Sequence, residues 1–226
     1  MNFYQFMDIY EDVFSPLYYM FFCALILIYL ESKWSDRLWK GVAVAIVAYA
    51  IAYATYSIWY FFPPAPQWIE DLLAVTGLMI AVGIALLALR KKIYGELVEK
   101  GIYILIVLTV PYMAISPFWN ISGHVAYTTA PSLYLGRVNK KLYVLMLVPL
   151  IMMINRPIVG AHTVLESIGG FVLAAISVVV GTYLYDKGKI KKDDVLPGTS
   201  QCSITGVHNL KNRHPAQETD EHKLPR

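Results

Sequence analysis

The chain alternates between long apolar runs and short polar segments over its first 185 residues, and it becomes polar from there to its end. A helix that crosses a membrane needs about 20 mainly apolar residues. Five runs approach or exceed that length, at residues 16–31, 39–62, 71–89, 101–119 and 164–185. The pattern therefore predicts an all-α protein, built as a polytopic bundle of transmembrane helices.

Two further apolar runs, 121–136 and 140–155, are shorter. Each has 16 residues, which extend about 24 Å at 1.5 Å per residue, whereas the hydrocarbon core of a bilayer is about 30 Å thick. Such a segment crosses the membrane only if its ends are drawn inward or if it lines a cavity walled by protein. We therefore expect about six to seven spans.

The distribution of basic residues favours seven spans. With seven, 18 of the 19 Lys and Arg residues fall on one side of the membrane and only Arg156 falls on the other. Without a crossing at 121–136, the split would become 8 against 11. Loops rich in Lys and Arg stay in the cytoplasm, so we expect a multi-pass protein of the cell membrane with its N-terminus outside. The 18 residues are Lys33, Arg37, Lys40, Arg90, Lys91, Lys92, Lys100, Arg137, Lys140, Lys141 and the eight that follow residue 186.

The composition agrees with a membrane protein. Of the 226 residues, 57% are hydrophobic and only 15% are charged, whereas about a quarter are charged in an ordinary soluble domain. The composition argues against a soluble enzyme and against a nucleic-acid partner, and two cysteines allow no disulfide framework. We expect a membrane-embedded domain over 1–187, in contact with membrane lipids, and a polar, disordered cytoplasmic tail over 188–226.

A cluster of polar residues lies at the outer side in this topology. His162 and Glu166 are four residues apart near the start of the last span, so on a helix they would share one face. Arg156 precedes them by one loop, and the tripeptide Ser-Gly-His at 122–124 begins another span. Ionisable groups at such a depth are costly and are functional by default.

Two kinds of chemistry suit this cluster. His124, His162 and Glu166 could hold zinc, but Arg156 would then place a cation beside a cation. The alternative is an anion site, because arginine offers a planar donor fork for phosphate oxygens. A neutral His162 oriented by Glu166 is then a capable nucleophile. We favour the phosphate site over the metal site.

The motifs resemble those of one family. Ser-Gly-His at 122–124 resembles the Pro-Ser-Gly-His motif of the type 2 phosphatidic acid phosphatase and vanadium haloperoxidase superfamily. Arg156, followed after five residues by His162 and after three more by Glu166, resembles the Ser-Arg, His, Asp motif of that superfamily. The resemblance covers about residues 116–185. It implies an all-helical membrane domain and a phosphatase that needs no metal and no cofactor.

The resemblance also implies a role for each residue. His162 would attack phosphorus and form a phosphohistidine, Glu166 would polarise His162, and His124 would protonate the departing oxygen. The phosphoryl oxygens would be held by Arg156, Ser122 and Gly123.

The first motif of the family, a Lys followed after six residues by Arg-Pro, has no counterpart in this chain. Some family members that lack it carry a proline-rich loop after the second span, and residues 61–68 look like that loop. It would lie outside and could close over the site, although a stiff interfacial turn explains it equally well. The candidate substrate-loop residues are Pro64, Pro66, Gln67 and Trp68.

The leading hypothesis is a lipid phosphatase that acts at the outer face on a polyprenyl diphosphate (dolichyl or undecaprenyl type) or a related lipid phosphate. Recycling of a glycan carrier lipid would fit that face. A lipid phosphotransferase resembling inositol-phosphorylceramide synthase is the first alternative, in which an alcohol takes the place of water. A catalytically inactive lipid-binding or transport protein is the second.

Overall fold

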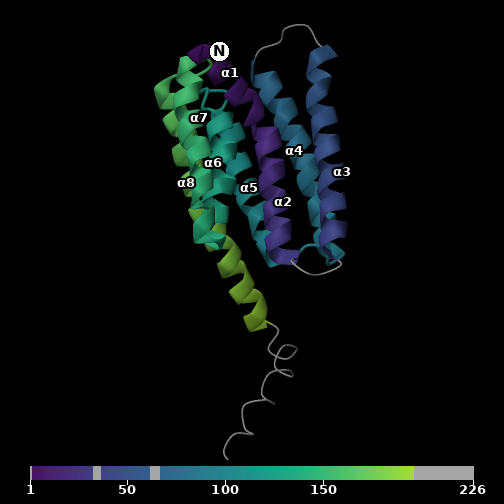
Figure 1. Cartoon of the computed structure of the whole chain (residues 1–226). Coiled ribbons are helices and arrows are strands. Elements are labelled where there is room, and N and C mark those ends of the chain that lie inside the picture. The colour runs from purple at the N-terminus through teal and green to yellow at the C-terminus, as the bar shows by residue number, and fades with distance from the viewer. Residues whose placement is uncertain (1, 33–36, 62–66, 196–226) are drawn as a thin grey trace, which may run out of the picture. The chain divides into compact units, whose positions relative to one another are not determined.

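The computed structural model describes residues 2–32, 37–61 and 67–195, and these contain helices and no strand. Residues 1–186 form one compact unit, and residues 187–226 form a second. Figure 1 shows the helices of the first unit side by side in a bundle. Their order is α1 (Phe3–Val13), α2 (Pro16–Ser32), α3 (Arg37–Ser57), η1 (Ile58–Phe61), α4 (Gln67–Arg90), α5 (Glu96–Ile115), α6 (Gly123–Val138), η2 (Lys140–Met146), α7 (Leu147–Ile158) and α8 (Val164–Val195).

Several of these helices are long and apolar enough to cross a membrane, so the protein is a multi-pass membrane protein. Five segments qualify among the described residues, and α1 with α2, bent by 52°, makes a sixth. The segment Lys140–Ile158, which joins η2 to α7, is one of the five. Helix α6 has 16 residues and is not among them, although it runs along the bundle beside its neighbours (Figure 1).

Helix α6 is the buried centre of the unit, which explains its modest hydrophobicity. It packs against α2, α5 and α7, and Val125, Ala126 and Thr128 on it are fully buried. The large apolar side chains of the outer helices are exposed instead, as Leu87 of α4 and Val110 of α5 illustrate. An outer helix in a bilayer faces lipid and gains nothing from polar residues, whereas a central helix faces only protein.

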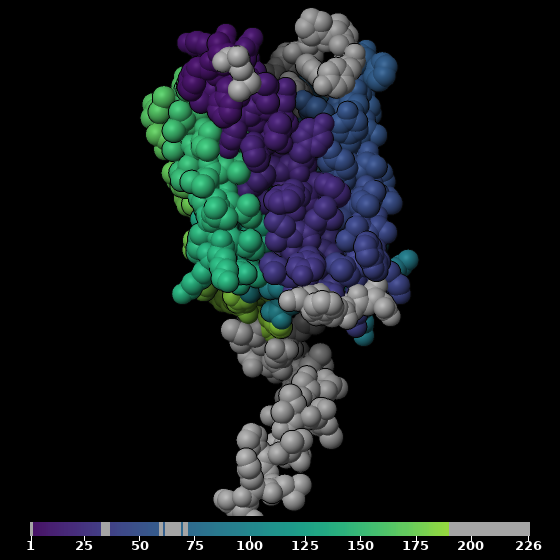
Figure 2. All heavy atoms as spheres, viewed as in Figure 1, coloured from purple at the N-terminus to yellow at the C-terminus, as the bar shows by residue number. Residues whose placement is uncertain are grey.

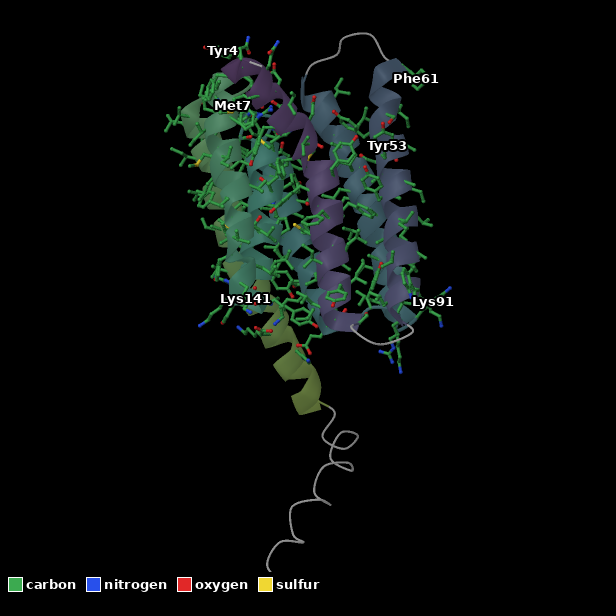
Figure 3. The ribbon with its side chains drawn as sticks, in the orientation of Figure 1. Tyr4, Met7, Tyr53, Phe61, Lys91 and Lys141 are labelled. Atoms are coloured by element: carbon green, nitrogen blue, oxygen red, sulfur yellow. The ribbon has the colours of Figure 1, made fainter. Side chains whose placement is uncertain are left out.

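The two ends of the bundle differ in charge. Figure 3 places Lys91 and Lys141 at one end, and Tyr4, Met7 and Phe61 at the other. At the basic end, the Glu31 carboxylate of α2 accepts hydrogen bonds from the backbone N–H groups of Gly95 and Leu97, at 2.8 and 2.5 Å. This carboxylate satisfies donors at the start of α5 that have no intrahelical acceptor. We call the opposite end, where α1 lies, the site end.

Two segments differ from the sequence-based expectation. Residues 3–13 form α1, an additional helix, because the Asn2 side chain and Gln5 make a capping box at its start. Helix α8, expected to end near residue 185, continues to Val195, past the expected domain boundary at 187. The rest of the expected tail, 196–226, lies outside the described residues.

Candidate functional site

The start of α6 is tied to the start of α8 at the site end. The backbone N–H of Ser122 donates to the carbonyl of Glu166 at 3.1 Å. The Ser122 hydroxyl caps α6 by accepting a hydrogen bond from the N–H of Val125 at 3.4 Å. Gly170 permits the close approach of α8, because a β-carbon on it would collide with the Ser122 carbonyl. Ser122 is therefore fully buried as a structural cap.

The next two residues face a cavity. Gly123 packs against the hydroxyl end of the Tyr112 side chain, and a β-carbon there would come within 2.6 Å of the Tyr112 hydroxyl oxygen. This space requirement explains the glycine. His124 follows in the first turn of α6, with 31% of its side chain exposed, and both residues line the cavity.

Arg156 enters from the last turn of α7. The chain then turns back on itself, because Gly160 adopts a positive φ of 75° that few other residues accept. The N–H groups of Ala161 and His162 donate to the Arg156 carbonyl, at 3.1 and 3.4 Å. These hydrogen bonds hold His162 close to Arg156. Both side chains are almost fully buried, with His162 4% exposed and Arg156 5% exposed.

His162 is oriented by a backbone carbonyl. Its Nδ1 lies 3.0 Å from the carbonyl oxygen of Asn120. A carbonyl only accepts, so Nδ1 carries the hydrogen and the lone pair resides on Nε2 when the ring is neutral. The Glu166 carboxylate is farther from Nδ1, at 3.7 Å, which is too long for a hydrogen bond.

Glu166 instead caps α8. Its carboxylate accepts a hydrogen bond from the N–H of Thr163 at 2.7 Å, and the Thr163 hydroxyl accepts one from the N–H of Glu166 at 3.3 Å. This reciprocal pair is a capping box. It starts α8 at Val164, so His162 precedes the helix. The expectation that His162 and Glu166 share a helix face is therefore wrong, although the two side chains remain neighbours.

The cavity at the site end has a volume of about 780 Å³. Its polar part includes His124, Arg156 and His162 together with Glu11 and Asp12 of α1. From there it extends between α2, α3, α4, α5 and α6, where most of its walls are aliphatic and aromatic side chains. Its volume falls within the range of about 300–1,000 Å³ that is typical of ligand pockets.

Glu11 is the residue that sequence reasoning missed. Its Oε1 forms an ion pair with Nη1 of Arg156 and lies 3.9 Å from Nε2 of His124. The signal was present in the sequence, because the first fifteen residues contain acids but no Lys or Arg. In a seven-span topology these acids lie at the same end as Arg156, the one basic residue that this topology places on the opposite side from all other Lys and Arg residues.

The structure brings four of the expected site residues together at the cavity and leaves the others apart. Gly123, His124, Arg156 and His162 line it, whereas Ser122 and Glu166 do not. Pro64 and Pro66 lie outside the described residues, and of Gln67 and Trp68 only the backbone, in the first turn of α4, is described. The described residues contain no group of three or more His, Cys, Asp and Glu side chains that could hold a metal ion. The alternative metal site of His124, His162 and Glu166 thus has no supporting geometry.

Comparisons of the chain with family models, with curated proteins and with solved structures find no match in any of the three. The family resemblance therefore depends on the two motifs alone.

Proposed function

We propose that this protein is an integral membrane lipid phosphatase of the type 2 phosphatidic acid phosphatase kind. The observation that carries the proposal is one histidine, His162, oriented through Nδ1 by a carbonyl and placed beside a buried arginine at the polar part of an apolar cavity. That arrangement suits attack by Nε2 on a phosphoryl group. The apolar walls of the cavity suit a lipid chain.

The reaction would proceed in two steps. Nε2 of His162 attacks phosphorus, an N–P bond forms, and the bond from phosphorus to the lipid-side oxygen breaks. His124, which takes up a proton when the phosphate dianion binds beside it, gives this proton to the departing oxygen. Water then attacks the phosphohistidine and loses a proton to His124, and the N–P bond breaks to release inorganic phosphate.

Charge on the phosphoryl oxygens would be balanced by Arg156 and by the start of α6. Amide N–H groups in the first turn of a helix lack intrahelical acceptors and attract anions, which suits Gly123 and His124. Among the described residues that line the cavity, Arg156 is the one Lys or Arg. Within the class of polyprenyl diphosphates and related lipid phosphates, a single cation favours a monophosphate.

The basic end of the bundle is proposed to face the cytoplasm, because loops rich in Lys and Arg are retained there. The site end would then face outside, level with the headgroups of the outer leaflet. Removal of phosphate from a glycan carrier lipid would fit that side.

A catalytically inactive lipid-binding protein is the second candidate, and two observations favour it. The Arg156 guanidinium is already paired with Glu11. The family resemblance implies that Glu166 polarises His162, but the Glu166 carboxylate accepts a hydrogen bond from the N–H of Thr163 instead. Such a protein would bind the same lipids without releasing phosphate.

One assay distinguishes these functions. Full-length protein in lipid nanodiscs is given polyprenyl monophosphate, polyprenyl diphosphate or phosphatidate, with a chelator and an acceptor alcohol present, and inorganic phosphate is measured. Release that survives the chelator and is lost in His162→Ala supports the phosphatase. A phosphorylated alcohol in place of free phosphate indicates a phosphotransferase. Lipid binding with no turnover of any substrate contradicts the proposal and leaves the binding protein.

A further inference from the structure

Glu11 is held at the cavity by a firmly anchored helix. The Tyr10 hydroxyl of α1 donates to the Val148 carbonyl at 2.9 Å, and the Asn155 side-chain amide donates to the Met7 carbonyl at 2.7 Å. Met7 and Tyr10 are both buried. Figure 2 shows α1 at the top of the visible face and α2 below it, both in purple, beside the green segments that include α7. The turn of α1 that carries Glu11 is thus anchored to α7.

Arg156 needs an anion in this position. Its side chain is 5% exposed, and its Nε is buried without a hydrogen-bond partner among the described residues. Within the same residues, Glu11 is the one carboxylate that forms an ion pair with it. A buried arginine that loses its only counter-ion is strongly destabilising, so the carboxylate leaves only when another anion replaces it.

A substrate phosphoryl group is such an anion, and beside the carboxylate it would place two negatively charged groups on one guanidinium. Two like charges within about 4 Å repel each other strongly in a buried site. Glu11 is able to move, because 26% of its side chain is exposed and its carboxylate is joined to the backbone by a flexible arm.

We infer that Glu11 is a counter-ion that the substrate phosphoryl group displaces from Arg156, and that this competition weakens the binding of every phosphate to the site, so that the product, inorganic phosphate, is held only loosely. The inference rests on the proposed function, and it adds to that site a residue that sets how tightly a phosphoryl group is held. Displacement of the carboxylate costs the same for a lipid phosphate and for inorganic phosphate. Only the lipid offsets it, because each CH₂ group buried in the cavity strengthens binding about fourfold. The product, inorganic phosphate, has no chain and is released.

The test compares Glu11→Gln with Asp12→Asn in full-length protein in lipid nanodiscs. Asp12 is adjacent, lines the same cavity and loses the same charge, but it forms no ion pair with Arg156 among the described contacts. Binding of inorganic phosphate is measured by calorimetry, which needs no turnover. We expect Glu11→Gln to bind phosphate about tenfold to a hundredfold more tightly than the wild type, the range set by one charge-assisted hydrogen bond. Asp12→Asn should change binding by less than about threefold, the scale of screened charges.

The inference is overturned if Glu11→Gln binds phosphate no more tightly than Asp12→Asn, or if neither variant binds phosphate at all. A second measurement uses the wild type alone, so it does not depend on the folding of a variant. In it, alkyl phosphates of increasing chain length should bind progressively more tightly than inorganic phosphate. Equal affinity for all of them also overturns it. Phosphate release from lipids is scored separately, so a failure of the proposed reaction and a failure of the role of Glu11 give different results.

Discussion

Replacement of Gly123 by alanine tests how tightly the site is built. The new β-carbon would lie 2.6 Å from the Tyr112 hydroxyl oxygen and 3.2 Å from its Cζ. An ordinary contact begins at 3.4 Å, so the first turn of α6 or the Tyr112 ring must move by about 0.8 Å. Overpacking of this kind costs about 1–3 kcal/mol, of which alanine recovers up to about 1 kcal/mol through its lower backbone entropy.

His124 is the next residue, so the displacement moves the proposed proton donor. A misplacement of about 1 Å can reduce a catalysed rate about a hundredfold. We therefore expect Gly123→Ala to lower kcat/KM for lipid phosphate by about tenfold to a hundredfold and to lower the Tm.

Removal of the Tyr112 hydroxyl should restore both quantities. The double variant Gly123→Ala/Tyr112→Phe has no oxygen at the point of collision, and Tyr112→Phe alone is the reference for any hydrogen bond that the hydroxyl makes. Tm and phosphate release are measured for all four proteins. Wild-type behaviour of Gly123→Ala, or a double variant as impaired as the single one, would refute the reasoning.

Two further substitutions test the neighbouring contacts. In Glu166→Gln the amide oxygen can still accept from the N–H of Thr163, so we expect phosphate release to fall by less than about tenfold. A loss of a thousandfold or more would instead assign to Glu166 a direct electrostatic role toward His162. Asn155→Leu removes the hydrogen bond to the Met7 carbonyl, which costs about 0.5–1.5 kcal/mol. A lower Tm and faster proteolysis within residues 3–13 are expected, and an unchanged Tm would show that α1 is held by other contacts.

Hydrophobic patterning predicted the long helices well, because a lipid-facing helix must be apolar along its whole length. The expected spans 16–31 and 71–89 correspond to α2 and α4. The same signal failed for α1, which is too short to span and is stabilised by capping and by contacts with α7. It also failed at the end of α8, since a helix can continue beyond the point where its hydrophobicity ends.

Four residues of the motifs line the cavity, but the motifs did not predict how the site residues contact one another. The turn at Gly160 and the glycines of α8 place His124, Arg156 and His162 at one cavity, as their spacing suggested. The sequence does not reveal that Glu166 forms a capping box with Thr163 rather than a hydrogen bond with His162, because a capping box and a helix-face pair have similar spacing. Nor does it reveal the pairing of Glu11 with Arg156, which joins residues 145 positions apart in the chain.

The most direct test of the central claim is to trap the covalent intermediate. Full-length protein is mixed with lipid phosphate, quenched within milliseconds in base, where phosphohistidine survives, and analysed by peptide mass spectrometry. The account predicts a phosphoryl group on His162 and none in the His162→Ala variant. Lipid turnover with no phosphoryl group on His162, undiminished in that variant, would contradict it.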